Sequence, residues 1–341
     1  MEYDKPYKNL EELVEILQTK HHLTITNKKN AIESLALIPY YDLVNGYKEY
    51  FMDDEDNFKP EISFDTLYFF HIFNKGFLNI LFEYSVVIES YYKNVLARII
   101  SEEIGISKEK YLDPSYYIRH AKPFDRGHIL QQLTTVYERS TDNPTKYYRE
   151  HHNHIPPWIL FKNVTFSNTI NLLYILPKKA KIKLVDELIR GNETWDQKYS
   201  VLIYILTLIR KFRNVIAHNL KFTTFSCKNY GKNLSKKVIR DIVSPYLLPQ
   251  DELTSEYGFY GLYGYIYFSL ALIPDSLIKI RLSHNLVSYI SSFHMGKSRD
   301  LDRFWQNQAT EYLLLANLPN DFAKRLLTEE RATFNRIYTR S

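Results

Sequence analysis

Helical periodicity runs through almost the whole chain and limits its fold more than any other feature. Apolar residues recur at helical spacing from Phe64 to about Glu103, where Ser63 can cap the start and Gly105 can end the helix. Gly76 is a candidate break within this stretch. A second strongly apolar stretch runs from Trp195 to about His218. Because the alternating patterns typical of strands are hard to find, the sequence predicts an all-α fold.

The composition is that of an ordinary globular protein of 341 residues, with 45% hydrophobic and 24% charged residues. Its single cysteine, Cys227, excludes a disulfide framework and any multi-cysteine metal site. The first nine residues contain no apolar signal segment, and no apolar run reaches the ~18–20 residues of a membrane helix. We therefore expect a cytoplasmic protein that has no membrane partner.

Charge and aromatic content leave the choice of partner open. Lys and Arg number 44 against 39 Asp and Glu, a net charge of +5, which permits nucleic-acid binding without requiring it. The 29 Tyr and 20 Phe residues can stack on unpaired bases, but packing between helices is the simpler interpretation. Tyr40, Tyr41 and Tyr47 are expected to pack their rings while their hydroxyl tips stay in water.

Three histidines lie close together near the middle of the chain. His151, His152 and His154 belong to a stretch, residues 140–153, that we expect to be a polar loop. Two adjacent histidines cannot easily bind one ion, and no cysteine or patterned acid joins them. The sequence therefore predicts no metal site.

The residues that can carry chemistry gather at the end of the second apolar stretch, in the run Arg213-Asn214-Val215-Ile216-Ala217-His218-Asn219. On a helix, Asn214 and His218 share a face because they are four residues apart. Arg213 lies about 140° from His218, so its long side chain must sweep round to meet the imidazole.

These side chains suit phosphodiester cleavage in RNA. An arginine holds a phosphate in a bidentate fork and stabilises its developing charge. A histidine takes a proton from a 2′-hydroxyl or gives one to a leaving oxygen near neutral pH, and an amide can orient either group. No metal is needed when the 2′-hydroxyl is the nucleophile. The same spacing also fits a surface arginine followed by a histidine that the helix dipole favours at a C-terminus.

The run resembles the Arg-x(4–6)-His motif of HEPN-fold ribonucleases, in the branch of bacterial abortive-infection (Abi) proteins that are AbiD/AbiF-like. Three further segments resemble this branch in the same order. They are Leu35–Tyr47 with its Tyr-Tyr and Gly-Tyr pairs, the long helix 64–100 with Glu89 and Lys93, and Pro156-Pro157-Trp158 followed by Thr165-Phe166. The resemblance covers about residues 5–225. Asp42 departs from it, standing where Arg is usual, and Asn74 stands where the long helix often has Asp.

The resemblance implies a HEPN-like helical bundle core, with additional N- and C-terminal helices, that forms a homodimer with a composite site. It implies metal-independent cutting of single-stranded RNA to leave a cyclic phosphate, a toxin role in phage defence and association with a small noncoding RNA. Arg213, Asn214 and His218 are then catalytic, Glu89 and Asn219 support them, and no cofactor and no DNA are expected.

Basic residues provide candidate RNA contacts outside the motif. Besides Lys93, the predicted set is Lys228, Lys232, Lys236, Lys237 and Arg240, with Tyr230 among them for stacking. A solvated linker would have the same composition. A second patch contains Lys297, Arg299, Arg303 and Trp305, and a third, diluted by acids, contains Lys324, Arg325, Arg331, Arg336 and Arg340.

The predicted organisation has three parts: an N-terminal helical segment (1–60), the HEPN-like core (61–225) and a C-terminal helical region (226–341), with RNA binding as one option for the last. The preferred function is an abortive-infection endoribonuclease. A catalytically silent RNA-binding scaffold of the same fold, and a protein-interaction module without RNA, remain as alternatives.

Overall fold

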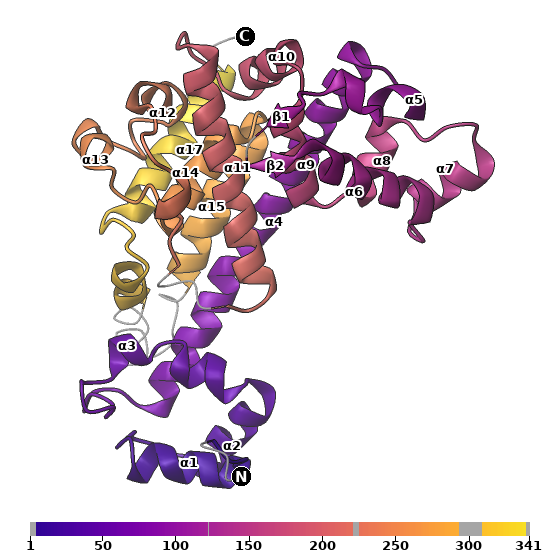
Figure 1. Cartoon of the computed structure of the whole chain (residues 1–341). Coiled ribbons are helices and arrows are strands. Elements are labelled where there is room, and N and C mark those ends of the chain that lie inside the picture. Colours follow the sequence, from indigo (N-terminus) through magenta and orange to yellow (C-terminus); the bar gives the residue numbers. More distant parts are fainter. Residues whose placement is uncertain (1–4, 122, 221–224, 293–308, 339–341) are drawn as a thin grey trace. The chain divides into compact units, whose positions relative to one another are not determined.

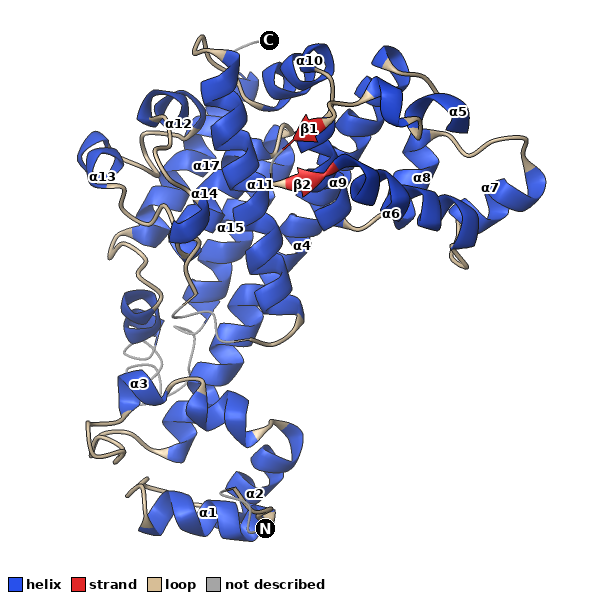
Figure 2. Ribbon diagram, viewed as in Figure 1, coloured by secondary structure: helices blue, strands red, loops and turns tan. Residues whose placement is uncertain are grey.

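The computed structural model describes residues 5–121, 123–220, 225–292 and 309–338, and helices dominate it (Figures 1 and 2). In these ranges the only paired strands are β1 (His120–Ala121) and β2 (Phe124–Asp125), a short antiparallel hairpin. The all-α prediction is therefore confirmed. The α-helices are α1 (Leu10–Thr19), α2 (Lys28–Leu37), α3 (Lys48–Phe51), α4 (Phe64–Glu103), α5 (Lys108–Tyr111), α6 (Arg126–Arg139), α7 (Thr145–His151), α8 (Pro157–Asn163), α9 (Phe166–Ile175), α10 (Lys178–Leu188), α11 (Trp195–Ala217), α12 (Lys236–Ile242), α13 (Gln250–Ser255), α14 (Leu262–Leu272), α15 (Ser276–Ser292) and α17 (Phe322–Tyr338).

The chain forms two compact units, each assembled from separate segments. The first unit comprises Met1–Ile80, Val215–Phe225 and Asn285–Ala323, and the second comprises Leu81–Asn214, Ser226–His284 and Lys324–Ser341. Four boundaries fall within α4, α11, α15 and α17, and the fifth follows Phe225. The three-part functional division given above stays a prediction.

Helix α4 continues without a break through Gly76, so the predicted division at this glycine is wrong. A Cβ at Gly76 would lie 2.0 Å from the hydroxyl oxygen of Tyr289, whose hydroxyl donates a hydrogen bond to the carbonyl of Phe73 at 3.0 Å. The glycine therefore lets a tyrosine of α15 reach the α4 backbone, and the surrounding apolar residues keep the helix intact. The predicted start is correct, since the Ser63 hydroxyl accepts from the backbone N–H of Thr66.

A buried polar network fixes the aromatic segment of the first unit. The Asn74 amide donates to the Tyr47 hydroxyl at 3.1 Å, and the Tyr312 hydroxyl donates to the Asn74 carbonyl oxygen at 2.9 Å. The prediction of a solvent-facing hydroxyl on Tyr47 is therefore wrong. Tyr41, which is 65% exposed, does not pack as predicted, because its side chain points to solvent from a π-helical turn, Tyr41–Asn45.

His71 adjoins this network and gives the fold a pH dependence. Its Nδ1 lies 3.3 Å from the Tyr47 hydroxyl, and burial, reinforced by Lys75, lowers the pKa of His71 to about 4. An unfolded histidine has a pKa of about 6.5, so between these values the unfolded chain binds more protons than the folded chain. Stability is then highest above the upper value and falls by about 3 kcal/mol as the pH drops through this window.

We expect His71→Asn, which cannot titrate, to lose this part of the pH dependence. Urea unfolding of the wild type and the variant at pH 5 and pH 7 measures it, and the variant should show the smaller difference. His128→Asn is the matched control because His128 is exposed. Equal pH dependence in the wild type and His71→Asn would contradict the prediction.

The second unit is built on buried tyrosines and phenylalanines. Tyr265 of α14 stacks on Phe212 of α11 with ring centroids 5.2 Å apart, and its hydroxyl donates to the Leu81 carbonyl of α4 at 2.8 Å. The hydroxyl of Tyr92 donates to the Thr169 carbonyl of α9 at 2.9 Å. These bonds satisfy hydroxyls in the apolar interior and hold α4, α9, α11 and α14 together (Figure 1).

The stretch expected as a polar loop, residues 140–153, contains helix α7, so that prediction is wrong in its centre. Asn163 of α8 accepts hydrogen bonds from the backbone N–H and hydroxyl of Thr145 at the first turn of α7. The imidazole of His151 stacks on Tyr147 with ring centroids 4.4 Å apart. Among the residues that the structure describes, no three His, Cys, Asp or Glu side chains group to hold a metal ion.

Candidate functional site

Helix α11 ends at the predicted motif. The backbone N–H of Leu220 donates to the Val215 carbonyl at 2.9 Å, and that of Asn219 donates to Ile216 at 3.2 Å. Asn219 has a φ of 56°, the left-handed conformation that closes a helix in this way. His218 is therefore the residue at which the helix stops, close to the negative end of the helix dipole.

The motif residues divide between the two units. Arg213 and Asn214 belong to the second unit, whereas His218 and Asn219 belong to the first.

Arg213 is held in place by groups on two helices. Its Nη2 lies 3.7 Å from Oε2 of Glu89 in α4, and its Nη1 donates to Oδ1 of Asn214 at 3.4 Å. The guanidinium carbon lies 5.8 Å from the centre of the Phe82 ring. Its Nε is buried and has no hydrogen-bond partner among the described residues. The side chain is half-buried, so part of the guanidinium remains open to a ligand.

Glu89 is shared between two cations. Lys93, one turn further along α4, places its Nζ 2.6 Å from Glu89 Oε1. The two side chains are only 13% and 14% exposed, so solvent screens this pair less than a surface ion pair. Lys93 and Arg213 together carry two positive charges against the single carboxylate of Glu89, and this group therefore favours an added anion.

A cavity of about 240 Å³ opens beside these charges. Its lining residues are Val86, Glu89, Ser90, Lys93, Asn94, Trp158, Phe161, Lys162 and Arg213. Trp158, in the first turn of α8, is 45% exposed, and Lys162 follows it by one helical turn. The cavity thus combines an indole surface with cationic groups, as sites for unpaired nucleotides do.

Trp158 and Lys162 are not among the residues predicted for the site. The signal that could have found them is local: Pro157 starts α8 as its first helical residue, and Trp158 and Lys162 are spaced to share a face of that helix. Only the packing of α8 shows that this face meets Glu89 and Lys93.

The other two motif residues lie at the surface of the first unit. The His218 imidazole is exposed and forms no hydrogen bond or ion pair with the described residues. The amide nitrogen of Asn219 donates to the carboxylate of Asp42. Asp42 therefore ties the aromatic segment to the turn that follows His218.

The predicted basic stretch lies on the surface of the second unit, and some of its charges are already engaged. Lys236 donates to the Thr254 carbonyl at 2.7 Å and lies 3.4 Å from Glu256, and Arg240 lies 3.8 Å from Asp241. The side chains that are exposed and form no hydrogen bond or ion pair within the described ranges are those of Lys228, Lys232 and Lys237.

Most of the last predicted patch lies at the surface, since Lys324, Arg331 and Arg336 are exposed. The patch of Lys297, Arg299, Arg303 and Trp305, and Arg340 of the last patch, lie outside the described residues. Arg325 is mostly buried and forms a bidentate pair with Glu252, at 2.6 and 2.7 Å. Arg325 therefore holds α17 to α13.

A model of the Abi-like protein family matches residues 33–223, more than half of the chain. The chain belongs to this abortive-infection family. The matched range of the Abi-like chain includes Glu89, Trp158, Arg213 and His218, whereas the basic stretch from Lys228 to Arg240 follows it. No curated protein and no solved structure matches the Abi-like chain. Within the described ranges, its helices are too short or too polar to cross a membrane.

Proposed function

We propose that this Abi-like protein is a HEPN-type endoribonuclease that acts in abortive infection and needs no metal for cleavage. The observation that carries the proposal is the placement of Arg213, which Glu89 holds at the wall of a cavity that also presents Trp158. A guanidinium held beside an aromatic surface suits a nucleotide, because the phosphate can bind the arginine while the base stacks on the indole of Trp158.

In the proposed reaction His218 is the general base. Its imidazole takes the proton of the ribose 2′-hydroxyl, the 2′-oxygen bonds to phosphorus, and the bond from phosphorus to the 5′-oxygen breaks. The products are a 2′,3′-cyclic phosphate and a 5′-hydroxyl. In the homodimer that we propose, His218 of the partner subunit gives the leaving oxygen its proton, so that both protons are accounted for.

Arg213 stabilises the negative charge that grows on the non-bridging oxygens during this attack. Glu89 orients the guanidinium, and Lys93 offsets the charge of Glu89, so the positive charge of Arg213 remains available to the phosphate. Asn214, whose side-chain oxygen accepts from Arg213, limits the rotation of the guanidinium.

A small noncoding RNA is the partner that we propose for the basic surface. Exposed Lys228, Lys232 and Lys237 present charges that phosphates can neutralise. Tyr230 lies beside this surface, and the Lys211 ammonium lies 4.9 Å from the centre of the Tyr230 ring.

The alternative, a silent RNA-binding scaffold, has one observation in its favour. A catalytic imidazole is usually oriented by a hydrogen-bonded neighbour, and His218 has no such neighbour among the described residues. In the scaffold, the same arginine and histidine grip a phosphate without cutting the strand.

The deciding experiment incubates the purified full chain with single-stranded RNA in the presence of a chelator. We expect cleavage with 2′,3′-cyclic phosphate ends, and a loss of about 10³-fold or more at any position where a 2′-deoxy nucleotide removes the nucleophile. Undiminished cleavage at the 2′-deoxy position, or its loss in the chelator, would show that the mechanism is wrong. Tight binding of intact RNA without any cleavage would favour the scaffold.

A further inference from the structure

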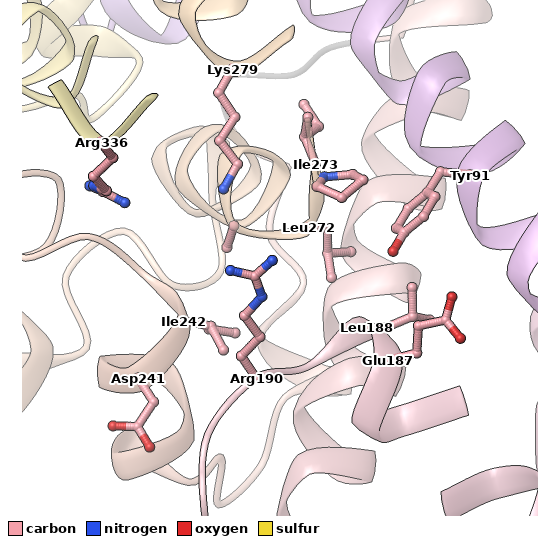
Figure 3. Close-up of a pocket in the computed structure, with 12 residues that line it drawn as sticks. Tyr91, Glu187, Leu188, Arg190, Asp241, Ile242, Leu272, Ile273, Lys279 and Arg336 are labelled. Atoms are coloured by element: carbon pink, nitrogen blue, oxygen red, sulfur yellow. The ribbon is translucent and has the colours of Figure 1, made fainter. Parts of the chain in front are cut away.

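Three cationic side chains converge on a second cavity system of the second unit. Arg190 follows α10, Lys279 lies in the first turn of α15, and Arg336 lies near the end of α17. Figure 3 shows the Lys279 ammonium and the Arg190 guanidinium pointing toward each other, with Arg336 to one side. Three hollows of about 180, 220 and 380 Å³ share Lys279 and Arg336 as lining residues. None of their lining residues belongs to the cavity of Arg213.

The three charges are close enough to oppose one another. Burial lowers the pKa of Lys279, and the nearby charges of Arg190 and Arg336 lower it further, while Glu329 acts in the opposite direction. Like charges brought together at a partly buried site destabilise the fold unless a counter-charge joins them.

The neighbouring carboxylates do not neutralise the cluster. Glu329 lies 3.5 Å from Arg336 and offsets one charge. Glu187 pairs with Arg98 outside the cavity, and Asp241 with Arg240. In Figure 3 the carboxylates of Glu187 and Asp241 are turned away from the centre of the cluster. Within the described ranges, Arg190 and Lys279 form no ion pair and no side-chain hydrogen bond.

We propose that this cavity binds a phosphomonoester. Two uncompensated cations match the charge of a phosphate dianion, and the guanidinium fork of Arg190 matches the geometry of its oxygens. The wall beside them is apolar, formed by Leu272, Ile273 and Pro274 with the ring of Tyr91. A ribose and base attached to the phosphate would cover this wall, which lines a hollow of about 180 Å³. The hollow of about 380 Å³ beside it shares Arg190, Lys279 and Arg336 and has the size of a small-molecule site.

The ligand is therefore a 5′-phosphorylated nucleoside, either free or at the end of an RNA strand. The site is separate from the proposed cleavage site: Tyr91 of α4 lies between Glu89 and Lys93 in sequence but points to another side of the helix. The proposal does not depend on ribonuclease activity.

Calorimetric titration of the full chain tests the proposal with four probes at low ionic strength. Two of the probes are AMP and adenosine. The other two are forms of a 2′-O-methyl RNA hexamer, which resists cleavage; one form carries a 5′-phosphate and the other does not. We expect AMP to bind and adenosine not to bind. Equal affinity of AMP and the phosphorylated hexamer identifies a free nucleotide as a sufficient ligand, and binding of the phosphorylated hexamer alone identifies an RNA end.

Charge-removing variants locate the site. Arg190→Gln, Lys279→Gln and Arg336→Gln should each weaken binding by about 10-fold, whereas Arg139→Gln, an equal change at an exposed position of α6, should not.

A second measurement needs no ligand. Removing one of three opposed charges should raise the melting temperature of ligand-free Lys279→Gln above that of the wild type, an increase that Arg139→Gln should not produce. The proposal is overturned if no phosphorylated probe binds, if Arg139→Gln weakens binding as much as the cavity variants, or if Lys279→Gln lowers the melting temperature and leaves binding intact.

Discussion

Replacing His218 by Ala is expected to reduce RNA cleavage by about 10³- to 10⁴-fold, because the substitution removes the group that takes the 2′-hydroxyl proton. RNA binding should change by less than about threefold, since the phosphate and base contacts that we propose come from Arg213, Lys93 and Trp158. His218 is exposed and packs into no core, so the variant should fold with the stability of the wild type. Single-turnover cleavage and filter binding of the same RNA measure the two effects.

His128→Ala is the matched control because it removes an equally exposed imidazole. It should cleave RNA at the wild-type rate. Normal cleavage by His218→Ala would remove this histidine from the mechanism. A parallel loss of RNA binding, together with a wild-type chain that never cuts, would favour the scaffold.

The part of the fold that depends on local sequence was predictable. The cap at Ser63, the positive φ of 134° at Gly105 after α4 and the end of α11 at His218 follow from the chemistry of a few neighbouring residues. The course of α4 through Gly76 was not predictable in this way. It depends on Tyr289, which comes from a distant part of the chain to occupy the space beside the glycine.

The candidate site likewise contains some residues that local sequence predicts and others that only the packing of distant segments brings together. Arg213 and His218 are recognisable because they share one short motif, and Glu89 could be named because a family resemblance supplied its position. The contribution of Trp158 depends on how α8 packs against α4, and no local pattern contains that information. The cluster of Arg190, Lys279 and Arg336 comes from three separate elements, so only the folded chain brings these charges together.

Replacing Arg213 by Lys is expected to lower the cleavage rate by about 10²- to 10³-fold while changing RNA affinity by less than about fivefold. Lysine keeps the positive charge, but its ammonium is a point donor that cannot hold two phosphate oxygens in one plane. In the wild type, Glu89 and Asn214 lie 3.7 and 3.4 Å from two different nitrogens of the guanidinium. The shorter lysine side chain has a single nitrogen, so it cannot keep both residues as partners. A loss of cleavage rate without a loss of RNA affinity would show that Arg213 stabilises the transition state. Arg210→Lys, the same change one turn earlier in α11, should cleave normally, and an equal loss in both variants would instead indicate a general effect on the helix.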